Sequence, residues 1–585
     1  MAIGISPWDR RDSKFHGSLR GADSPRQSDT FQGRFGRMFR ALPAAQFSDE
    51  DLIALAQGAD GMEAEAETAT IGGKVLPSAT PESDTGFKPV PVVPDDEENF
   101  GIPAGYTYLG QFIDHDITFD PMSSLMKDND PEALIDFRTP ALDLDNIYGR
   151  GPADQPYMYT KEVGVAADLF VLGRPLTANG KPTKAFDLPR VGERAVIGDK
   201  RNDENVIISQ LQGVFLQFHN AMARANPTAS FGEVQRLVRW HYQYVVIHDF
   251  LPRIVGSKTM LAILPRHKKG EIQDLAPKLL FYRWREAPFM PVEFAAAAYR
   301  FGHSMVRPIY RLSTQLSEQG DETGVAGRKF IFAAVKNSGL NGFHSFDSRW
   351  AIEWRLYFPL GGRKLDPDDL TMGRLQPAYK IDTALVNPLA FLPEFSAPDG
   401  AGGDLLLDGK GKPQPTDAKD DPPSLALRNL LRGRAMGLPS GEAVAMAMGL
   451  DPLHPSEVRI GKATVEKTFG TTGANKTAAD ISSNFSGNTP LWVYVLAEAQ
   501  NDWAKEAAKI KGTDAAAVKK KNSIHVHLGA VGGRIVAEVL VGLIHGDPNS
   551  YLAQAPFWTP DEGDGGAAFG MANLIEMSGV ASTPA

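Results

Sequence analysis

Helical periodicity is the feature of this sequence that most restricts its fold. One stretch repeats apolar residues at spacings of three, four and seven positions, which places them on one face of an amphipathic helix: Leu211, Val214, Phe215, Phe218 and Met222. Further helical patterns occupy 234–248, 293–305, 424–436, 488–503 and 528–544. Strand signals are few and short, and long loops interrupt the helices, so the sequence predicts a mainly α fold.

Composition excludes several classes of protein. With 585 residues, of which 42% are hydrophobic and 23% are charged, the chain is long enough to bury a large core. Its net charge of -10 disfavours binding to nucleic acid or to an anionic membrane surface. Because the chain has no cysteine, disulfides, thiolate metal sites and cysteine nucleophiles are excluded.

The N-terminal part differs in composition from the rest. Residues 1–100 are rich in glycine, proline and acids, as in SATPESDTGFKPVPVVPDDEEN at 78–99, and this composition favours extended and turn conformations. We therefore expect an N-terminal arm at 1–100 and one large domain at 101–585. No apolar run near the N-terminus has the character of a signal-peptide core, so we expect a cytoplasmic protein or export by a signal-independent route.

The most apolar late segment is HLGAVGGRIVAEVLVGLIHG at 527–546. Arg534 and Glu538 lie within it, and two charges make a membrane span unfavourable. We predict a buried helix in which Gly529, Gly532 and Gly533 allow close packing against a neighbouring element.

The stretch YLGQFIDHDITFDP at 108–121 places a histidine between two aspartates inside an apolar run. On a helix with about 100° per residue, Gln111, Asp114 and His115 share the face opposite the apolar residues. Asp116 instead turns to the apolar side, where a buried carboxylate needs a cation or several hydrogen-bond donors. The competing interpretation is a surface helix whose acids are solvated.

The segment RTPALDLDNIYG at 138–149 offers oxygen ligands at alternate positions. In an extended loop four residues face the same way, with the alanine able to offer only its carbonyl: Thr139, Ala141, Asp143 and Asp145. Alternating oxygen donors that include carboxylates suit a hard cation such as Ca²⁺. This loop and Asp116 together predict one calcium site, although aspartate-rich turns are also common without a metal.

These two segments carry a family resemblance. GQFIDHDITFDP followed by TPALDLDNIYG resembles the animal-type haem peroxidases of the peroxidase–cyclooxygenase superfamily, with the bacterial members as the most similar. Other stretches resemble the family in the same order: DKRNDE at 199–204, YRFGHSMVRP at 299–308, RNLLRGRAMGLP at 428–439 and LGAVGGRIVAEVLVGLI at 528–544. The resemblance covers 101–544 and implies the fold of that family and haem b as the cofactor.

The residues around position 303 can also be interpreted without the family. On a single helix, an apolar face lies opposite His303: Phe294, Ala298, Phe301 and Met305. A histidine that points away from the apolar face and lies beside arginines suits a large anionic ligand. Gly302, which has no side chain, would let a porphyrin approach. A surface histidine among charges is the simpler alternative for this segment taken alone.

On the proximal side, the resemblance implies that His303 binds the haem iron. Asn429 would accept the proton on the other ring nitrogen of His303, which would fix the ring and raise its donor strength. Arg300 and Arg432 would pair with the haem propionates.

On the distal side, the resemblance implies that His115 acts first as a base and then as an acid toward H2O2. Arg201 would stabilise the charge that develops along the breaking O–O bond. Gln111 would hold a distal water or a halide.

The resemblance also implies covalent attachment of the haem, because Asp114 and Glu204 match the ester-forming acids of the family. The next residue is Asn205, where the strongest chloride oxidisers have a methionine that forms a third, sulfonium link. This departure disfavours a third bond and efficient chloride oxidation. The expected donors are therefore iodide, thiocyanate, bromide or phenols.

Two alternative functions stay open. A fatty-acid dioxygenase of the same superfamily needs a tyrosine three residues before the proximal histidine, but that position is Arg300, and Tyr299 is four residues before. A calcium-dependent adhesion or binding module would not need the catalytic set, and the sequence has no RGD tripeptide and no repeat array. The partners expected are H2O2 and small electron donors, and the sequence predicts no oligomeric state.

Overall fold

The structure is a computed structural model of the whole chain. It describes residues 33–63, 68–71, 74–77, 96–119, 135–136, 138–264, 276–284, 287–316, 328–333, 339–369, 371, 373–396, 398–399, 404–405, 422–471, 473–560 and 569–580. Positions 1–32 of the expected arm and most of the loop at 398–423 lie outside these residues.

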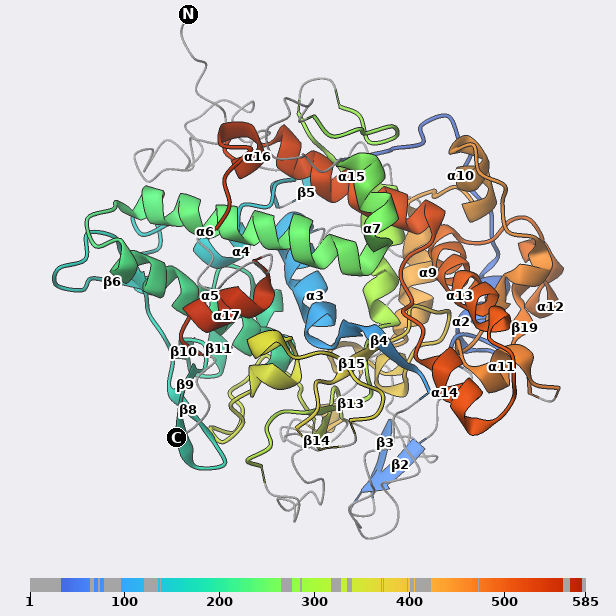
Figure 1. Cartoon of the computed structure of the whole chain (residues 1–585), viewed down its shortest axis with the longest axis horizontal. Coiled ribbons are helices and arrows are strands. Elements are labelled where there is room, and N and C mark those ends of the chain that lie inside the picture. Colours follow the sequence, from blue (N-terminus) through green and yellow to red (C-terminus); the bar gives the residue numbers. More distant parts are fainter. Residues whose placement is uncertain are drawn as a thin grey trace, which may run out of the picture.

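The mainly α fold predicted from the sequence is confirmed (Figure 1). The α-helices are α2 (Asp49–Gln57), α3 (Gly105–Ile117), α4 (Asp145–Tyr148), α5 (Val206–Ala225), α6 (Phe231–Val245), α7 (Leu251–Ile263), α8 (Val292–Ala295), α9 (Leu425–Ala435), α10 (Gly441–Ala447), α11 (Val465–Phe469), α12 (Ala478–Ile481), α13 (Leu491–Lys509), α14 (Ala515–Asn522), α15 (Ala530–Gly546), α16 (Tyr551–Gln554) and α17 (Met571–Met577). Short helical turns that bear on the site are η5 (Lys200–Asp203), η6 (Val246–Phe250), η7 (Ala298–His303), η9 (Leu360–Gly362) and η11 (Pro393–Phe395). None of the helices in the described ranges is both long and apolar enough to cross a bilayer.

The strands are short and form small sheets. The described pairs are β2 (Thr68–Ile71) with β3 (Lys74–Pro77), β4 (Glu98–Pro103) with β15 (Pro377–Tyr379), β6 (Tyr159–Thr160) with β7 (Leu169–Phe170), β8 (Pro175–Ala178) with β9 (Lys181–Phe186), β10 (Arg190–Val191) with β11 (Arg194–Ala195), β13 (Ile309–Arg311) with β14 (Arg328–Phe330), β16 (Pro398–Asp399) with β17 (Asp404–Leu405) and β18 (Arg459–Ile460) with β19 (Lys476–Thr477). A three-stranded sheet places β1 (Gly33–Gly36) between β12 (Met290–Pro291) and β5 (Ile135–Asp136).

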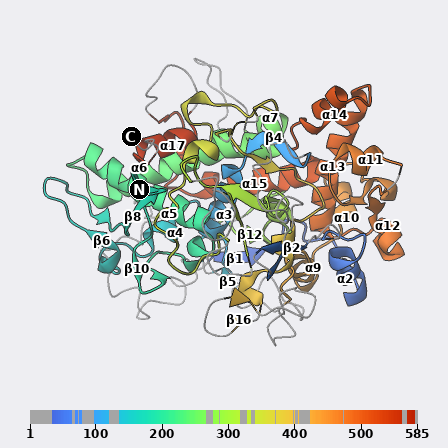
Figure 2. The same cartoon turned by 90° about the horizontal axis from the view of Figure 1, so that it is seen from below.

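Helix α3 lies near the centre of the molecule, in contact with α5 and η7 (Figure 1, Figure 2). Phe112 of α3 stacks on Phe215 of α5 with ring centroids 4.3 Å apart and planes at 5°. Tyr242 of α6 meets both rings edge-on, at 6.0 Å and 5.8 Å. These aromatic contacts bury the apolar face of α3 and leave its other face for polar side chains.

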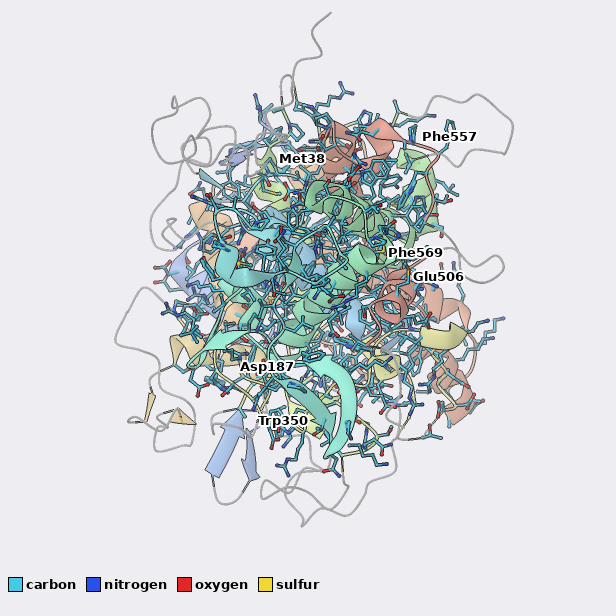
Figure 3. All side chains as sticks on the ribbon, turned by 90° about the vertical axis from the view of Figure 1, so that its left-hand side faces the viewer. Met38, Asp187, Trp350, Glu506, Phe557 and Phe569 are labelled. Atoms are coloured by element: carbon cyan, nitrogen blue, oxygen red, sulfur yellow. The ribbon has the colours of Figure 1, made fainter. Side chains whose placement is uncertain are left out.

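Side chains fill the space between the helices (Figure 3). Phe569, which precedes α17, lies against α6, and its ring centroid is 5.3 Å from that of His241. His241 and His219 are buried residues of the core. His241 bonds the Leu237 carbonyl, and His219 bonds Tyr148 and the Asp168 carbonyl, as expected for structural histidines.

Part of the expected arm is folded against the helical body. Residues 33–63 include β1 and α2, and α2 packs on α9. Ser48 caps α2 by accepting a hydrogen bond from the Asp51 backbone N–H at 3.1 Å. The buried Glu293 carboxylate accepts the backbone N–H groups of Met38 and Phe39 at 3.0 and 3.1 Å. The extended and turn conformations expected for 1–100 are therefore wrong for α2.

The single helix expected at 293–305 is also wrong. The chain forms α8 and then η7, and the break falls at Ala297, whose φ and ψ are -139° and -77°. Arg300 Nε donates to the Ala295 carbonyl at 3.0 Å. In a continued helix a backbone N–H would bond this carbonyl, and here the Arg300 side chain takes its place. Trp492 of α13 donates to the Arg300 carbonyl at 3.2 Å and holds the second turn.

Helix α15 is buried and packs closely, as its glycines predicted. A Cβ atom at Gly532 would lie 2.5 Å from Val495 Cγ1, and one at Gly529 would lie 2.3 Å from Glu498 Cγ. The Glu498 carboxylate accepts the Val531 and Gly532 backbone N–H groups at 2.9 and 3.3 Å. Since α15 also contacts η7, this close packing supports the turn that carries His303.

We expect Gly532→Ala to lower the free energy of unfolding by about 1–3 kcal/mol, because the added methyl group overpacks the contact with α13. Gly232→Ala is the matched control. Gly232 lies in α6 with no atom within 4 Å of its Cβ position, so alanine should leave stability unchanged or raise it. Denaturant unfolding of both variants measures the difference, and equal stabilities would contradict the close packing of α15.

Candidate active site

A cavity of about 860 Å³ lies between α3, η5, η7 and α9. Nearly all the residues predicted for catalysis and haem binding border it: Gln111, Asp114, His115, Arg201, Glu204, Arg300, His303 and Arg432. Asn429 lies directly behind His303. The structure thus brings together side chains that are far apart in the sequence, while the role of each one stays a prediction.

His115 projects from the polar face of α3 and is 5% exposed. Its Nδ1 lies 2.7 Å from Asn202 Oδ1, and Asn202 Nδ2 donates to Gln212 Oε1 at 2.8 Å. With the amide of Asn202 in this orientation, the proton of His115 lies on Nδ1 and Nε2 keeps a lone pair. Burial lowers the pKa of His115 to about 4, so the ring is neutral at pH 7.

Arg201 is tied to its surroundings by several hydrogen bonds. Its Nη2 donates to the carbonyls of His115 and Thr118 at 3.0 and 2.7 Å, and to Asp199 at 2.8 Å. Its guanidinium lies 4.6 Å from the centroid of the Phe119 ring. Its Nε donates to Asp199 at 3.2 Å, and the described residues place no hydrogen-bond partner on Nη1.

Acidic and amide side chains extend the same wall of the cavity. Glu204 and Gln111 are in direct hydrogen-bond contact, and burial raises the pKa of Glu204 to about 8. Asp114 accepts a hydrogen bond from Thr118 Oγ1 at 3.0 Å. Asn205 caps α5, since its side chain accepts the backbone N–H groups of the second and third helical residues at 3.1 and 2.9 Å.

His303 ends η7, and its Nδ1 lies 2.7 Å from the side-chain amide of Asn429. Burial, with a further contribution from Arg300, lowers the pKa of His303 to about 3. The ring is therefore neutral, which is the form that binds a metal, and its Nε2 is the nitrogen left for a ligand.

The orientation of the Asn429 amide differs from the expected one. Its nitrogen faces His303 Nδ1, and its oxygen accepts a hydrogen bond from Arg300 Nη1. The two amide positions are nearly isosteric, so a half-turn of the amide would present the oxygen to His303. That turn requires Arg300 to leave Asn429, for example for a propionate.

The cavity fits a haem group in size and in chemistry. Its volume lies within the range of roughly 300–1,000 Å³ that is usual for ligand sites. A Cβ atom at Gly302, which borders the cavity beside His303, would meet no atom within 4 Å. Two neutral histidines, several arginines and apolar side chains such as Val292 and Phe332 also line it, as an iron porphyrin with two propionates requires.

Asp116, Asp143 and Asp145 converge beside α3, with one carboxylate oxygen of each lying within 4.8 Å of the others. Asp116 is completely buried, and its Oδ1 has no hydrogen-bond partner in the described part of the chain. Burial and the two neighbouring carboxylates raise the pKa of Asp116 well above its usual value. Thr139 is held there by a 2.8 Å hydrogen bond to Asp143. These oxygens fit a hard cation such as Ca²⁺.

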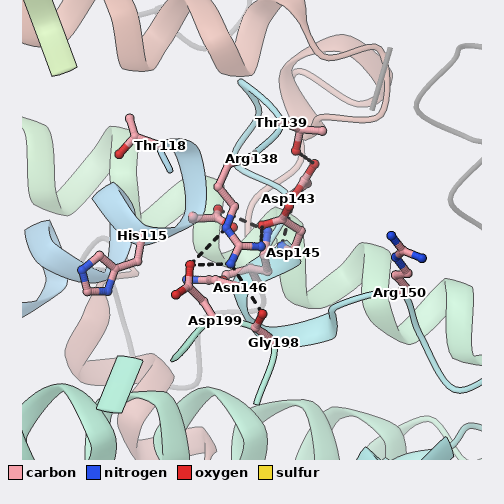
Figure 4. A network of polar contacts seen from close by, with 12 residues as sticks. His115, Thr118, Arg138, Thr139, Asp143, Asp145, Asn146, Arg150, Gly198 and Asp199 are labelled. Atoms are coloured by element: carbon pink, nitrogen blue, oxygen red, sulfur yellow. Dashed lines mark hydrogen bonds and ion pairs between the residues drawn. The ribbon is translucent and has the colours of Figure 1, made fainter. Parts of the chain in front are cut away.

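Arg138 joins the carboxylate cluster to the distal wall (Figure 4). Its Nη1 is 3.2 Å from Asp145, and its Nε is 3.1 Å from Asp199. Asp199 in turn binds Arg201. Although burial raises the pKa of Asp199, its ion pairs with Arg201 and Arg138 hold it well below its usual range.

The sequence reasoning missed Arg138, Asp199 and Asn202. Asp199 and Asn202 lie in DKRNDE, from which only Arg201 and Glu204 had been assigned. Arg138 is the first residue of the segment interpreted as a cation loop. An arginine next to predicted buried acids is a signal that would have pointed to it.

Comparisons with known proteins find similarity to animal haem peroxidases. The sequence model described as "Animal haem peroxidase" matches residues 123–340. The chain is 24% identical over 250 residues to "Probable oxidoreductase PXDNL" of Homo sapiens, covering 38% of this chain and 16% of that protein. It is 34% identical over 119 residues to "Chorion peroxidase" of Drosophila melanogaster, covering 19% of this chain and 14% of that protein.

Longer matches have lower identity. "Heme peroxidase 2" of Caenorhabditis elegans is 22% identical over 375 residues, which cover 54% of this chain and 48% of that protein. Among solved structures, "Peroxidase A from Dictyostelium discoideum" aligns with a TM-score of 0.49 and 15% identity, covering 94% of this chain and 93% of that one. The sequence matches show that residues 123–340 of this chain are similar to the animal haem peroxidase family.

Proposed function

We propose that this protein is a haem b peroxidase that reduces H2O2 and oxidises small donors. One observation carries the proposal: His115 and His303 border the same cavity, and each has its Nδ1 against a side-chain amide. A side-chain amide orients each ring and leaves Nε2 for chemistry, as a haem site with a distal base and a proximal ligand requires. Among the branches of the family, we propose that the protein belongs to the bacterial one.

On the distal side, the residues would handle protons and charge. His115 Nε2 takes a proton from one oxygen of H2O2 and returns it to the other oxygen, which leaves as water. Asn202 keeps the ring in the required tautomer during both steps. Arg201, held by Asp199 through Nε and Nη2, presents Nη1 to the oxygen on which charge develops. Gln111 positions a distal water or a small donor.

On the proximal side, His303 would bind the haem iron, and the haem supplies the redox chemistry when it is bound. Asn429 accepts the Nδ1 proton of His303 after its amide turns, which strengthens the ring as a donor. Arg300 and Arg432 provide positive charge for the propionates. The proposed donors are iodide, thiocyanate, bromide and phenols.

His115→Ala should keep the haem but lose roughly 10²–10⁴-fold in the rate of reaction with H2O2, because the proton-transfer base is removed. Stopped-flow absorbance of the haem band measures this rate. His454→Ala, at a histidine outside the cavity, is the control and should react like the unchanged protein. Loss of iron ligation in His115→Ala, with ligation kept in His303→Ala, would mean that the two sides have been interchanged.

A fatty-acid dioxygenase is the second candidate, and one observation favours it: Tyr299 borders the cavity, although Arg300 occupies the expected tyrosine position. The Tyr299 hydroxyl donates to the Gly110 carbonyl at 3.2 Å. Oxidation of a phenolic dye by H2O2 supports the peroxidase. Uptake of O2 with linoleate in place of that reaction supports the dioxygenase.

We also propose that Asp116, Thr139, Ala141, Asp143 and Asp145 bind a structural Ca²⁺. The support is a completely buried carboxylate oxygen without a partner beside two further carboxylates. A divalent cation would offset their mutual repulsion. The series Asp145, Arg138, Asp199 and Arg201 would carry the effect of the ion to the distal wall.

Calcium should stabilise the unchanged protein by about 2.7 kcal/mol at one hundred times its dissociation constant. Asp116→Asn should lose this gain, yet unfold no more easily than the unchanged protein when calcium is absent, because the repulsion at the cluster is smaller. Asp347→Asn, outside the cluster, should keep the gain. Thermal unfolding with calcium and with chelator distinguishes these cases, and active protein that contains no calcium would refute the site.

The haem is proposed to be ester-linked through Asp114 and Glu204. Both acids border the cavity, and the raised pKa of Glu204 keeps a protonated carboxyl available near neutral pH. Self-oxidation by peroxide would form the links, so protein that has not met H2O2 would be only partly linked.

After brief H2O2 treatment, acidified organic solvent should fail to extract the haem from the unchanged protein. The double variant Asp114→Asn, Glu204→Gln should release all of it, since an amide cannot form the ester. The variant Glu394→Gln, at another acid of the cavity, is the control and should retain its haem. Complete release from the unchanged protein would contradict the covalent attachment.

A further inference from the structure

A second cavity of about 850 Å³ opens beside η9 and α17, outside the site described above. Its walls are partly aromatic and apolar, with Phe100, Phe569 and Leu375 among them, and partly basic, with Arg363 and Lys364. Gly361, Gly362 and Lys364 are exposed, so the cavity is reached from the surface.

Tyr106 is the one described residue that borders both cavities. It lies in the first turn of α3 and is 1% exposed. Its hydroxyl donates to Asp249 Oδ2 at 2.7 Å, and Asp249 itself lines the second cavity. Arg253 pairs with Asp249 at 2.9 Å and lies 4.7 Å from the centroid of the Tyr106 ring.

The partner of this hydroxyl distinguishes Tyr106 from the other tyrosines of the haem cavity. A phenol that loses an electron becomes strongly acidic, so its oxidation at neutral pH needs a proton acceptor within hydrogen-bond reach. Tyr299 donates to a backbone carbonyl, which is not a base, and the Tyr108 hydroxyl has no hydrogen-bond partner among the described residues. The Tyr106 hydroxyl, in contrast, donates to a carboxylate.

We propose that the second cavity binds a phenolic donor and that Tyr106 relays its electron to the haem site. The proposal rests on the peroxidase function proposed above, because peroxide is the oxidant. Tyr106 gives one electron to the oxidised site, and its proton moves to Asp249 Oδ2. The bound phenol then supplies one electron and releases its own proton to solvent, while Asp249 returns its proton to the Tyr106 oxygen. Two such cycles convert one H2O2 and two phenols into two waters and two phenoxyl radicals.

The charges of the cavity indicate the kind of phenol. Asp249 is paired with Arg253, and Glu576 accepts the Gly361 backbone N–H at 3.1 Å. Arg363 donates to the carbonyls of Arg355 and Gly373 at 3.2 and 2.6 Å, so these bonds leave its positive charge without a carboxylate. A phenol with a carboxylate at its other end would place its ring among the aromatic walls and its charge near Arg363 and Lys364.

Binding is tested with 4-hydroxyphenylpropionate by ligand-observed saturation-transfer NMR, without peroxide. Ala572→Trp fills the cavity from α17, and Lys364→Glu reverses an exposed charge without affecting the core. Each should weaken binding at least tenfold, and each should lower oxidation of this phenol similarly while leaving iodide oxidation unchanged. Ala553→Trp, on the exposed side of α16, is the matched control and should bind normally.

The relay is tested by electron paramagnetic resonance of samples frozen after mixing with H2O2. The unchanged protein should show a tyrosyl radical signal, which Tyr106→Phe should lose and Tyr299→Phe should keep. Persistence of the signal in Tyr106→Phe overturns the relay. Binding that neither Ala572→Trp nor Lys364→Glu weakens overturns the donor site.

The failure of the peroxidase proposal has a different signature. Protein without a haem absorbance band, or without iodide oxidation by H2O2, would refute the relay together with the peroxidase function. Normal iodide oxidation with no radical on Tyr106 and no binding in the second cavity would refute the relay alone.

Discussion

The ion pairs of Arg138 are the interaction on which the distal half of the site depends. Three carboxylates meet beside α3, and one of them is completely buried, so their repulsion must be offset for α3 to pack. Arg138 offsets part of the negative charge of this cluster by pairing with Asp145, and its other nitrogens bind Asp199. The burial of α3 and the position of Arg201 therefore both depend on the guanidinium of Arg138.

Asp199 extends this dependence to the backbone of α3. It orients Arg201, whose Nη2 then donates to the carbonyls of His115 and Thr118 near the end of that helix. These carbonyls have no partner within the helix, so Arg201 satisfies them as a side-chain cap would. Arg201 is thus both a structural cap of α3 and a cation beside His115. Loss of Arg201 would disturb the base and the charge stabilisation together, so its kinetic effect alone would not measure either one.

The sequence predicted those parts of the fold that depend on local periodicity. The faces of α3 follow from its apolar spacing, and the burial of Asp116 agrees with the face assigned to it. The close packing of α15 followed from its glycines. The break at Ala297 could not be predicted from periodicity, because it is stabilised by hydrogen bonds from two side chains, that of Arg300 and that of Trp492, which is distant in the sequence. Periodicity also carries no information on side-chain partners such as Asn202, which only the packing of η5 on α3 brings to His115.

The proximal half depends on Arg300 in a comparable way. Its Nε satisfies the Ala295 carbonyl at the break between α8 and η7, and its Nη1 meets the Asn429 amide behind His303. The position that a fatty-acid dioxygenase would give to a tyrosine is here used to shape the turn that presents the histidine. A tyrosine at this position has one hydroxyl in place of five N–H donors and could not make both contacts. Of these two contacts, only the one to the Ala295 carbonyl remains when the Asn429 amide turns toward His303, so Arg300 shapes the proximal turn through its Nε.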